Sequence, residues 1–124
     1  DQLTEINTRK TGALLAASCA IGAAAAGAEE EKIEAASRFG RLLGLAFQIR
    51  DDVLDVISTD AQLGKPVGSD AEEQKNTYMA LLGIEGCTAE INRLTESAIS
   101  VLEEHFPHTE FFSALAGSLA KRVN

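Results

Sequence analysis

The stretch "EEEKIEAASRFGRLLGLAFQIRDDVLDVIST", residues 29–59, decides the fold because its pattern predicts one very long α-helix. The acidic run from Glu29 to Glu31 suits the positive end of a helix dipole and marks the start of this helix. At 1.5 Å per residue, the helix would be about 45 Å long and would span a whole domain. The chain is therefore expected to be built from long helices.

A second helix is predicted before it, over residues 2–27. Its small residues, among them Gly12, Ala16, Ala20 and Gly27, would let the backbone of a neighbouring helix approach closely. Gly27 is expected to end this helix, since glycine accepts the backbone conformation found at helix ends.

The remainder of the chain also predicts helices and no strands. Residues 59–70 form the one irregular segment, with two glycines and a proline, and Ser69 followed by Glu72 fits a capping box that starts a new helix. The helices expected after this segment cover residues 75–83, with a stop at Gly83, then residues 86–105 and residues 109–122. The fold class is all-α, in one domain of 124 residues.

Charge and composition exclude several classes of partner. A net charge of −8 argues against nucleic acid or an anionic membrane as the main partner and favours cations. The uncharged stretch Ala13 to Ala28 is shorter than the about 20 residues that a membrane span needs. Cys19 and Cys87 match no metal-ligand spacing, which indicates reduced thiols in a reducing compartment such as the cytoplasm.

Three aspartates stand among apolar residues near the end of the long helix. Positions four apart share a helix face, so Phe47, Asp51 and Asp55 form one row, and Gln48 and Asp52 form the row beside it. Carboxylates this close repel one another, and a divalent cation relieves that repulsion. Because all the candidate ligands are oxygens, the pattern indicates a hard ion such as Mg²⁺.

The alternative interpretation is a solvated acidic face paired with Arg50. Basic residues on either side of the motif in sequence favour a binding site instead: Lys65 lies in the irregular segment, Lys75 at the start of the next helix, and Lys10 beside Thr11 on the first helix. A metal that bridges carboxylate to phosphate, with lysines that neutralise the remaining charge, forms a diphosphate site.

Four motifs carry a resemblance to a known family: "KTGALLAAS" at residues 10–18, "FQIRDDVLD" at 47–55, "LGKPVGSD" at 63–70 and "KNTY" at 75–78. In this order and spacing they resemble trans-isoprenyl diphosphate synthases of the polyprenyl synthetase family, in particular the bacterial short-chain farnesyl/geranylgeranyl type. The resemblance implies a bundle of long helices around a deep central cavity, in a cytoplasmic homodimer. It also implies a prenyltransferase that condenses an allylic diphosphate with isopentenyl diphosphate and depends on Mg²⁺, with Mn²⁺ as the alternative ion.

The same resemblance implies a role for each matching residue. The aspartates would hold the metal, lysines would bind the substrate diphosphate, and residues beside the reacting carbons would line the pocket. The metal ligands are Asp51, Asp52 and Asp55, the diphosphate-binding residues are Lys10, Lys65 and Lys75, the pocket residues are Thr11, Phe47 and Gln48, and the residues expected to serve catalysis are Lys10, Thr11 and Gln48. Tyr78, in the "KNTY" motif, is expected to be structural.

One departure from the family pattern limits these expectations. Members of the family carry an earlier aspartate-rich motif followed by paired arginines, and no second "DDxxD" occurs in the 124 residues. Residues 1–124 are therefore expected to be the C-terminal part of a single synthase domain, unable to turn over substrate alone. The alternatives are a non-catalytic regulatory or partner subunit of such a synthase, and a structural helical bundle whose stability is independent of divalent cations.

Overall fold

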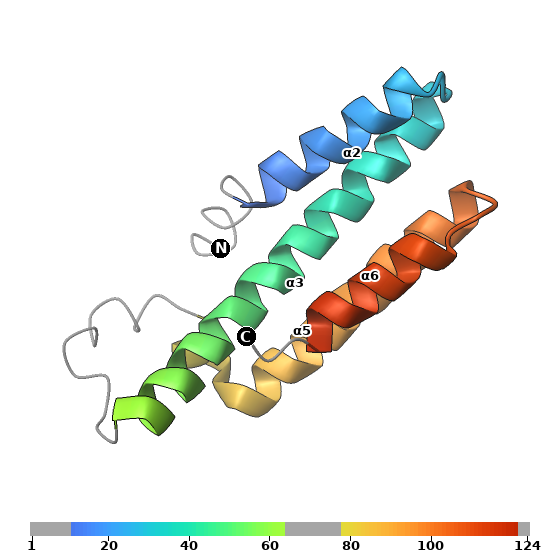
Figure 1. Cartoon of the computed structure of the whole chain (residues 1–124). Helices are drawn as coiled ribbons and strands as arrows, with labels where there is room; N and C mark the ends of the chain where they lie inside the picture. The colour runs from blue at the N-terminus through green and yellow to red at the C-terminus, as the bar shows by residue number, and fades with distance from the viewer. Residues whose placement is uncertain (1–10, 64–77, 122–124) are drawn as a thin grey trace.

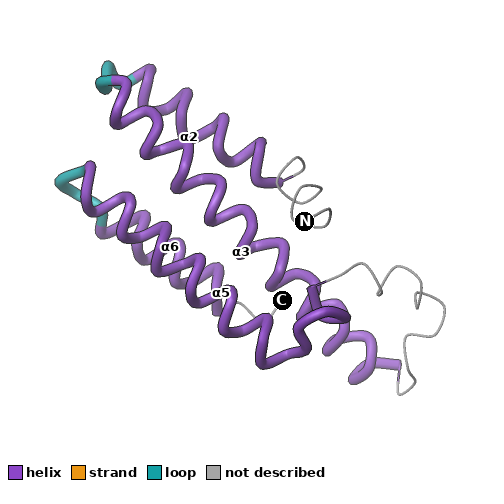
Figure 2. The backbone as a smooth tube through the Cα atoms, turned by 180° about the vertical axis from the view of Figure 1, so that it is seen from behind, coloured by secondary structure: helices purple, strands orange, loops and turns teal. Residues whose placement is uncertain are grey.

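The computed structural model describes residues 11–63 and 78–121 of the chain. These residues form four α-helices and contain no strand, so the all-α prediction is confirmed (Figure 1). The helices are α2 (Ala13–Ala25), α3 (Glu30–Leu63), α5 (Tyr78–His105) and α6 (Glu110–Lys121). Helix α2 folds back along α3, and α6 folds back along α5 (Figure 2).

A short turn joins α2 to α3, and Gly27 lies within it. Its φ of 82° is a left-handed conformation that side chains with a Cβ disfavour. The N–H of Gly27 donates to the carbonyl of Ala24, and the N–H of Ala28 donates to the carbonyl of Ala23, both at 3.0 Å. This pair of hydrogen bonds is the Schellman arrangement, which satisfies the last carbonyls of the helix. The prediction that Gly27 ends the first helix is confirmed.

The backbones of α2 and α3 touch where two glycines of α3 meet α2. A Cβ at Gly40 would lie 2.5 Å from the carbonyl oxygen of Leu15 and 2.9 Å from the Cα of Ala16. A Cβ at Gly44 would lie 2.7 Å from the Cα of Gly12. The close approach predicted for Gly12 and Ala16 is confirmed. It does not extend to Gly27, where a Cβ would meet nothing within 4 Å.

Helix α3 is longer than the sequence pattern indicated. It ends at Leu63, so the residues after Thr59 that were expected to begin the irregular segment are helical instead. The strong helix breakers, Gly64 and Pro66, come only later in the sequence. The rest of that segment, with the expected capping box, lies outside the described residues.

Helix α5 contains the break that was predicted at Gly83. This residue has a φ of 71° and a ψ of 177°, which interrupts the helix after its first turns. Beyond the break α5 continues to His105, and α6 follows from Glu110 to Lys121, close to the bounds expected for the last two helices.

The core lies mainly between α3 and α5 and consists of two clusters. The first joins α3 to the start and middle of α5 through Ala46, Ile49, Val53, Tyr78, Cys87, Ile91 and Leu94. The second joins α3 to the end of α5 and to α6 through Phe39, Leu43, Ala98, Leu102 and Ala116. The rings of Phe39 and Phe112 meet edge to face with centroids 6.1 Å apart. Helix α3 is thus the element against which the other helices are positioned.

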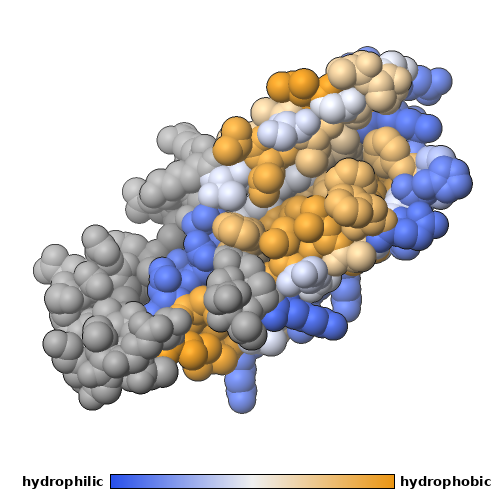
Figure 3. Space-filling model, viewed as in Figure 1, coloured by the Kyte–Doolittle hydropathy of each residue, from blue (hydrophilic) through white to orange (hydrophobic). Residues whose placement is uncertain are grey.

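Large apolar side chains remain exposed on α2 and α6. Leu14 and Ile21 on α2 and Phe111 on α6 are each more than two-thirds exposed, at 69%, 68% and 71%. Figure 3 shows apolar atoms, orange and tan, spread over both helices on the face turned to the viewer. Among the described helices, none combines the length and the apolar character that crossing a membrane requires.

Candidate metal and diphosphate site

Helix α3 positions the three aspartates of the predicted metal site. Asp51 and Asp52 are half-buried and Asp55 is exposed, while Val53, between them in sequence, is buried in the core. Burial of Val53 and Ile49 fixes the rotation of α3 about its axis. The carboxylates therefore lie where the packed part of the helix meets its solvent-accessible side.

The environment of Asp52 opposes its negative charge. Burial raises the pKa of the Asp52 carboxyl, and the neighbouring charges of Asp55 and Asp51 raise that pKa further. A hydrogen bond from the backbone N–H of Tyr78 acts in the opposite direction and lowers the pKa. A bound cation would relieve both the desolvation and the repulsion.

The donor set limits the kind of ion that this place can hold. Across residues 11–63 and 78–121, no three His, Cys, Asp or Glu side chains are grouped so that they could enclose a metal ion. A site closed by protein ligands alone is thus not formed by the described residues. Mg²⁺ typically takes only one or two carboxylates and fills its other positions with water and substrate phosphate. Asp51, Asp52 and Asp55 are therefore not brought together as a three-ligand group, and their role in holding an ion stays a prediction.

Thr11 and Gln48, two of the predicted pocket residues, are in direct contact. The side-chain Nε2 of Gln48 donates a hydrogen bond of 2.7 Å to the Thr11 hydroxyl, and both side chains are partly buried. Gln48 lies one helical turn before Asp52, so this hydrogen bond adjoins the carboxylates. Phe47 is half-buried beside Gln48 on α3. Their roles toward a substrate stay predictions.

The three lysines predicted to bind diphosphate, Lys10, Lys65 and Lys75, lie outside the described residues, and their contacts stay predictions. Tyr78, which follows them in sequence, is described and begins α5. Its side chain is buried, at 8% exposure, in the first core cluster. The sequence did not predict the hydrogen bond from the backbone N–H of Tyr78 to Asp52, because no local pattern reveals which helix end packs beside the aspartates.

Both cysteines are free thiols. Cys87 is fully buried near Asp52, and Cys19 is half-buried on α2. Burial raises the pKa of each thiol, and at Cys87 the charge of Asp52 raises it further. Both therefore favour the neutral, unreactive form.

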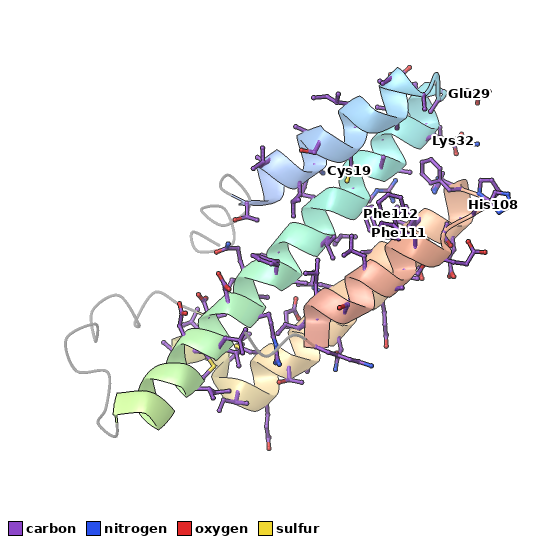
Figure 4. All side chains as sticks on the ribbon, in the orientation of Figure 1. Cys19, Glu29, Lys32, His108, Phe111 and Phe112 are labelled. Atoms are coloured by element: carbon purple, nitrogen blue, oxygen red, sulfur yellow. The ribbon has the colours of Figure 1, made fainter. Side chains whose placement is uncertain are left out.

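An apolar cavity of about 490 Å³ lies toward the other end of the helices. Its α3 residues come at least twelve positions before Asp51, about 18 Å along the helix axis. Its lining residues are Ser18, Cys19, Gly22, Ala23, Ala36, Phe39, Leu102, Phe106, His108, Thr109 and Phe112. Figure 4 shows the labelled Cys19 of α2 and Phe112 of α6 on the two sides of this region. The resemblance implied a central cavity, but no local sequence pattern identified these lining residues, because they come together only where four elements meet.

Comparison with known proteins decides the family. The sequence model of the polyprenyl synthetase family matches residues 1–109, which is most of the chain. The chain belongs to the polyprenyl synthetase family. The expectation raised by the four sequence motifs is confirmed at this level.

This member of the polyprenyl synthetase family is similar to several named enzymes. It is 50% identical to a dimethylallyltranstransferase from Fischerella ambigua, over 77% of this chain and 28% of the relative. It is 45% identical to a geranylgeranyl diphosphate synthase from Cyanophora paradoxa, over 79% of this chain and 33% of the relative. It is 36% identical to the farnesyl diphosphate synthase from Escherichia coli, over 98% of this chain and 42% of the relative. The chain thus spans between about a quarter and two-fifths of the length of these relatives.

Proposed function

We propose that this chain is part of a trans-isoprenyl diphosphate synthase, a prenyltransferase that condenses an allylic diphosphate with isopentenyl diphosphate. The observation that carries the proposal is the placement of half-buried Asp51 and Asp52 one helical turn from the Thr11–Gln48 hydrogen bond. A partly desolvated group of carboxylates beside uncharged polar groups is suited to a metal-bound diphosphate and the carbon attached to it. The family membership and the names of the relatives support this reaction class.

The chemistry assigned to the site is ionisation of the allylic diphosphate. The bond between the allylic carbon and the diphosphate oxygen breaks, and both electrons leave with the diphosphate. Mg²⁺, when bound, supplies positive charge that stabilises this leaving group. Asp51, Asp52 and Asp55 would hold the ion, and Lys10, Lys65 and Lys75 would neutralise the remaining charge of the diphosphate.

The carbocation that remains needs a different environment. Thr11 and Gln48 would direct uncharged dipoles toward the allylic carbon, and the fixed hydrogen bond between them keeps those dipoles oriented. Phe47 would supply an aromatic wall and help to exclude water. The apolar cavity farther along α2 and α3 supports a substrate with a hydrocarbon chain.

The proposal includes the organisation of the whole enzyme. Residues 1–124 would form the C-terminal part of one synthase domain, and the first aspartate-rich motif would come from other residues of that domain. The single "DDxxD" in the chain and its short coverage of the relatives support this view. The exposed apolar side chains of α2 and α6 support association, here assigned to a homodimer. Free thiols support a cytoplasmic location.

Ligand-dependent stability tests the proposed site in the 124-residue chain itself. Mg²⁺ and inorganic diphosphate, added together at about 100 times their dissociation constant, should stabilise the folded state by about 2.7 kcal/mol. The double variant Asp51→Asn/Asp52→Asn should lose this stabilisation in thermal unfolding. The matched control, Glu103→Gln/Glu104→Gln, removes two charges from exposed positions near the C-terminal end of α5. This control should retain the stabilisation by Mg²⁺ and diphosphate. Absence of any stabilisation in the wild type would support the structural-bundle alternative.

A further inference from the structure

The start of α5 makes a specific contact with the aspartates of α3. Tyr78 is the first residue of α5, and its backbone N–H donates a hydrogen bond to the Asp52 carboxylate. The first N–H groups of an α-helix have no acceptor within their own helix. At Tyr78 the acceptor comes from a residue on a different helix, which belongs to the candidate metal site.

The side chain of Tyr78 holds this N–H in place. Its ring is buried at 8% exposure in the same core cluster as Ile49 and Val53 of α3. Val53 directly follows Asp52, and Ile49 lies about one turn before it. Ring packing and the backbone hydrogen bond therefore attach the start of α5 to one short stretch of α3.

We propose that Tyr78 is a positioning residue for Asp52: its backbone N–H holds the carboxylate in the orientation that binds a divalent cation. This inference rests on the proposed function, and it assigns to Tyr78 a role beyond filling the core. An ionised carboxylate offers about four acceptor positions on its two oxygens, so one N–H donor leaves the others for the metal. Partners that hydrogen-bond to metal ligands typically change metal affinity 10- to 100-fold when they are lost.

Two substitutions at Tyr78 separate the backbone contribution from that of the ring. Tyr78→Ala and Tyr78→Pro both remove the ring, but only proline also removes the N–H. Proline is tolerated at the first position of a helix, so the substitution is compatible with the start of α5. Tyr78→Phe keeps both the ring and the N–H and serves as the control that retains the fold.

The readout is the dissociation constant for Mg²⁺ in the presence of inorganic diphosphate, measured by titration calorimetry on the 124-residue chain. Tyr78→Phe should match the wild type, and Tyr78→Pro should bind Mg²⁺ about 10-fold more weakly than Tyr78→Ala. Equal affinities of the proline and alanine variants would overturn the inference. A wild type that binds no Mg²⁺ with diphosphate would overturn the proposed function, and with it the metal-related role of Tyr78.

A second measurement uses the metal-free protein and does not depend on the Tyr78 variants folding. Amide hydrogen exchange at Tyr78 should be slower in the wild type than in Asp52→Ala, which lacks the acceptor. The amide of Ile91, in the middle of α5, reports global stability and provides the reference. Equal exchange rates at Tyr78, after this correction, would show that Asp52 does not hold the N–H and would overturn the inference independently of metal binding.

Discussion

The side-chain amide of Gln48 donates a 2.7 Å hydrogen bond to the hydroxyl of Thr11 and so joins the middle of α3 to the residues just before α2. Both groups are partly withdrawn from solvent. Each therefore depends on the other for a partner that water would otherwise provide.

Replacing Thr11 with valine keeps the shape of the side chain and removes the hydroxyl. The amide of Gln48 then loses its acceptor, and we expect the free energy of unfolding to fall by about 1–2 kcal/mol in urea denaturation. In the double variant Thr11→Val/Gln48→Leu, the loss of unfolding free energy should be smaller than the sum of the losses in the two single variants. Each single change already removes the hydrogen bond, so the second change removes nothing further from it. Ser18→Ala is the control: its exposed hydroxyl donates a hydrogen bond to the carbonyl of Leu14 in the same helix, and its loss should have little effect.

Alanine at Gly40 tests the contact between α2 and α3. Its Cβ would lie 2.5 Å from the carbonyl oxygen of Leu15, so the two helices must separate or shift. We expect a loss of about 2–3 kcal/mol, the upper part of the range for overpacked cores. Gly117→Ala on α6 meets nothing within 4 Å and should instead stabilise the protein by about 0.5–1 kcal/mol through helix propensity. Equal effects of the two substitutions in chemical denaturation would contradict the close contact.

Gly27 should resist substitution for a conformational reason. Space for a Cβ is available there, but the φ of 82° is unfavourable for alanine. Gly27→Ala is expected to lower the free energy of unfolding by about 1–2 kcal/mol. Gly22→Ala, inside α2 with equally open surroundings but no positive φ, should be stabilising. Thermal unfolding of the two variants in parallel would separate backbone strain from crowding.

The raised pKa of Asp52 predicts a pH dependence of stability in the absence of metal. The folded state binds the Asp52 proton more tightly than the unfolded chain does, because burial raises its pKa above the ordinary 3.8. The contribution of this group to the free energy of unfolding is therefore greatest at pH values below 3.8. It decreases as the pH rises through the raised pKa of the folded state. Asp52→Asn should remove this decrease and be more stable than the wild type at neutral pH.

The measurement for Asp52→Asn is urea denaturation across the acidic to neutral range with divalent ions chelated. Other carboxyl groups add their own pH dependence, so the quantity to follow is the difference between variant and wild type. Mg²⁺ with inorganic diphosphate should reverse the order at neutral pH, because only the wild type retains the Asp52 carboxylate as a ligand. A difference that does not change with pH would contradict the assigned cause of the raised pKa.

Local sequence patterns predicted the helices well because their ends depend on individual residues. Gly27 and Gly83 have the positive φ values that end or interrupt a helix, and both were expected to do so. The end of α3 was misplaced because Thr59 only weakly disfavours a helix, so its neighbours decide the outcome. Gly40 and Gly44 were not singled out, since their importance comes from the facing residues of α2.

The candidate site was predictable to the extent that it lies on one helix. The spacing of Asp51, Asp52 and Asp55 placed them together on α3, and family resemblance placed Thr11 and Gln48 in one pocket. The hydrogen bond from Tyr78 to Asp52 joins separate helices, and such a contact depends on the angle and position at which they pack. The lining of the apolar cavity was not predicted for the same reason, because its residues come from four elements.

The glycine contacts between α2 and α3 also determine register. The α2 backbone lies this close to α3 because Gly40 and Gly44 carry no side chain, so sliding α2 along α3 would bring its backbone against a residue with a Cβ. The place of Thr11 opposite Gln48 is therefore set by Gly12, Gly40 and Gly44 rather than by the turn at the other end of α2. That turn should tolerate changes in length, while a single inserted residue between Thr11 and Ala16 would rotate the hydroxyl by about 100° away from its partner.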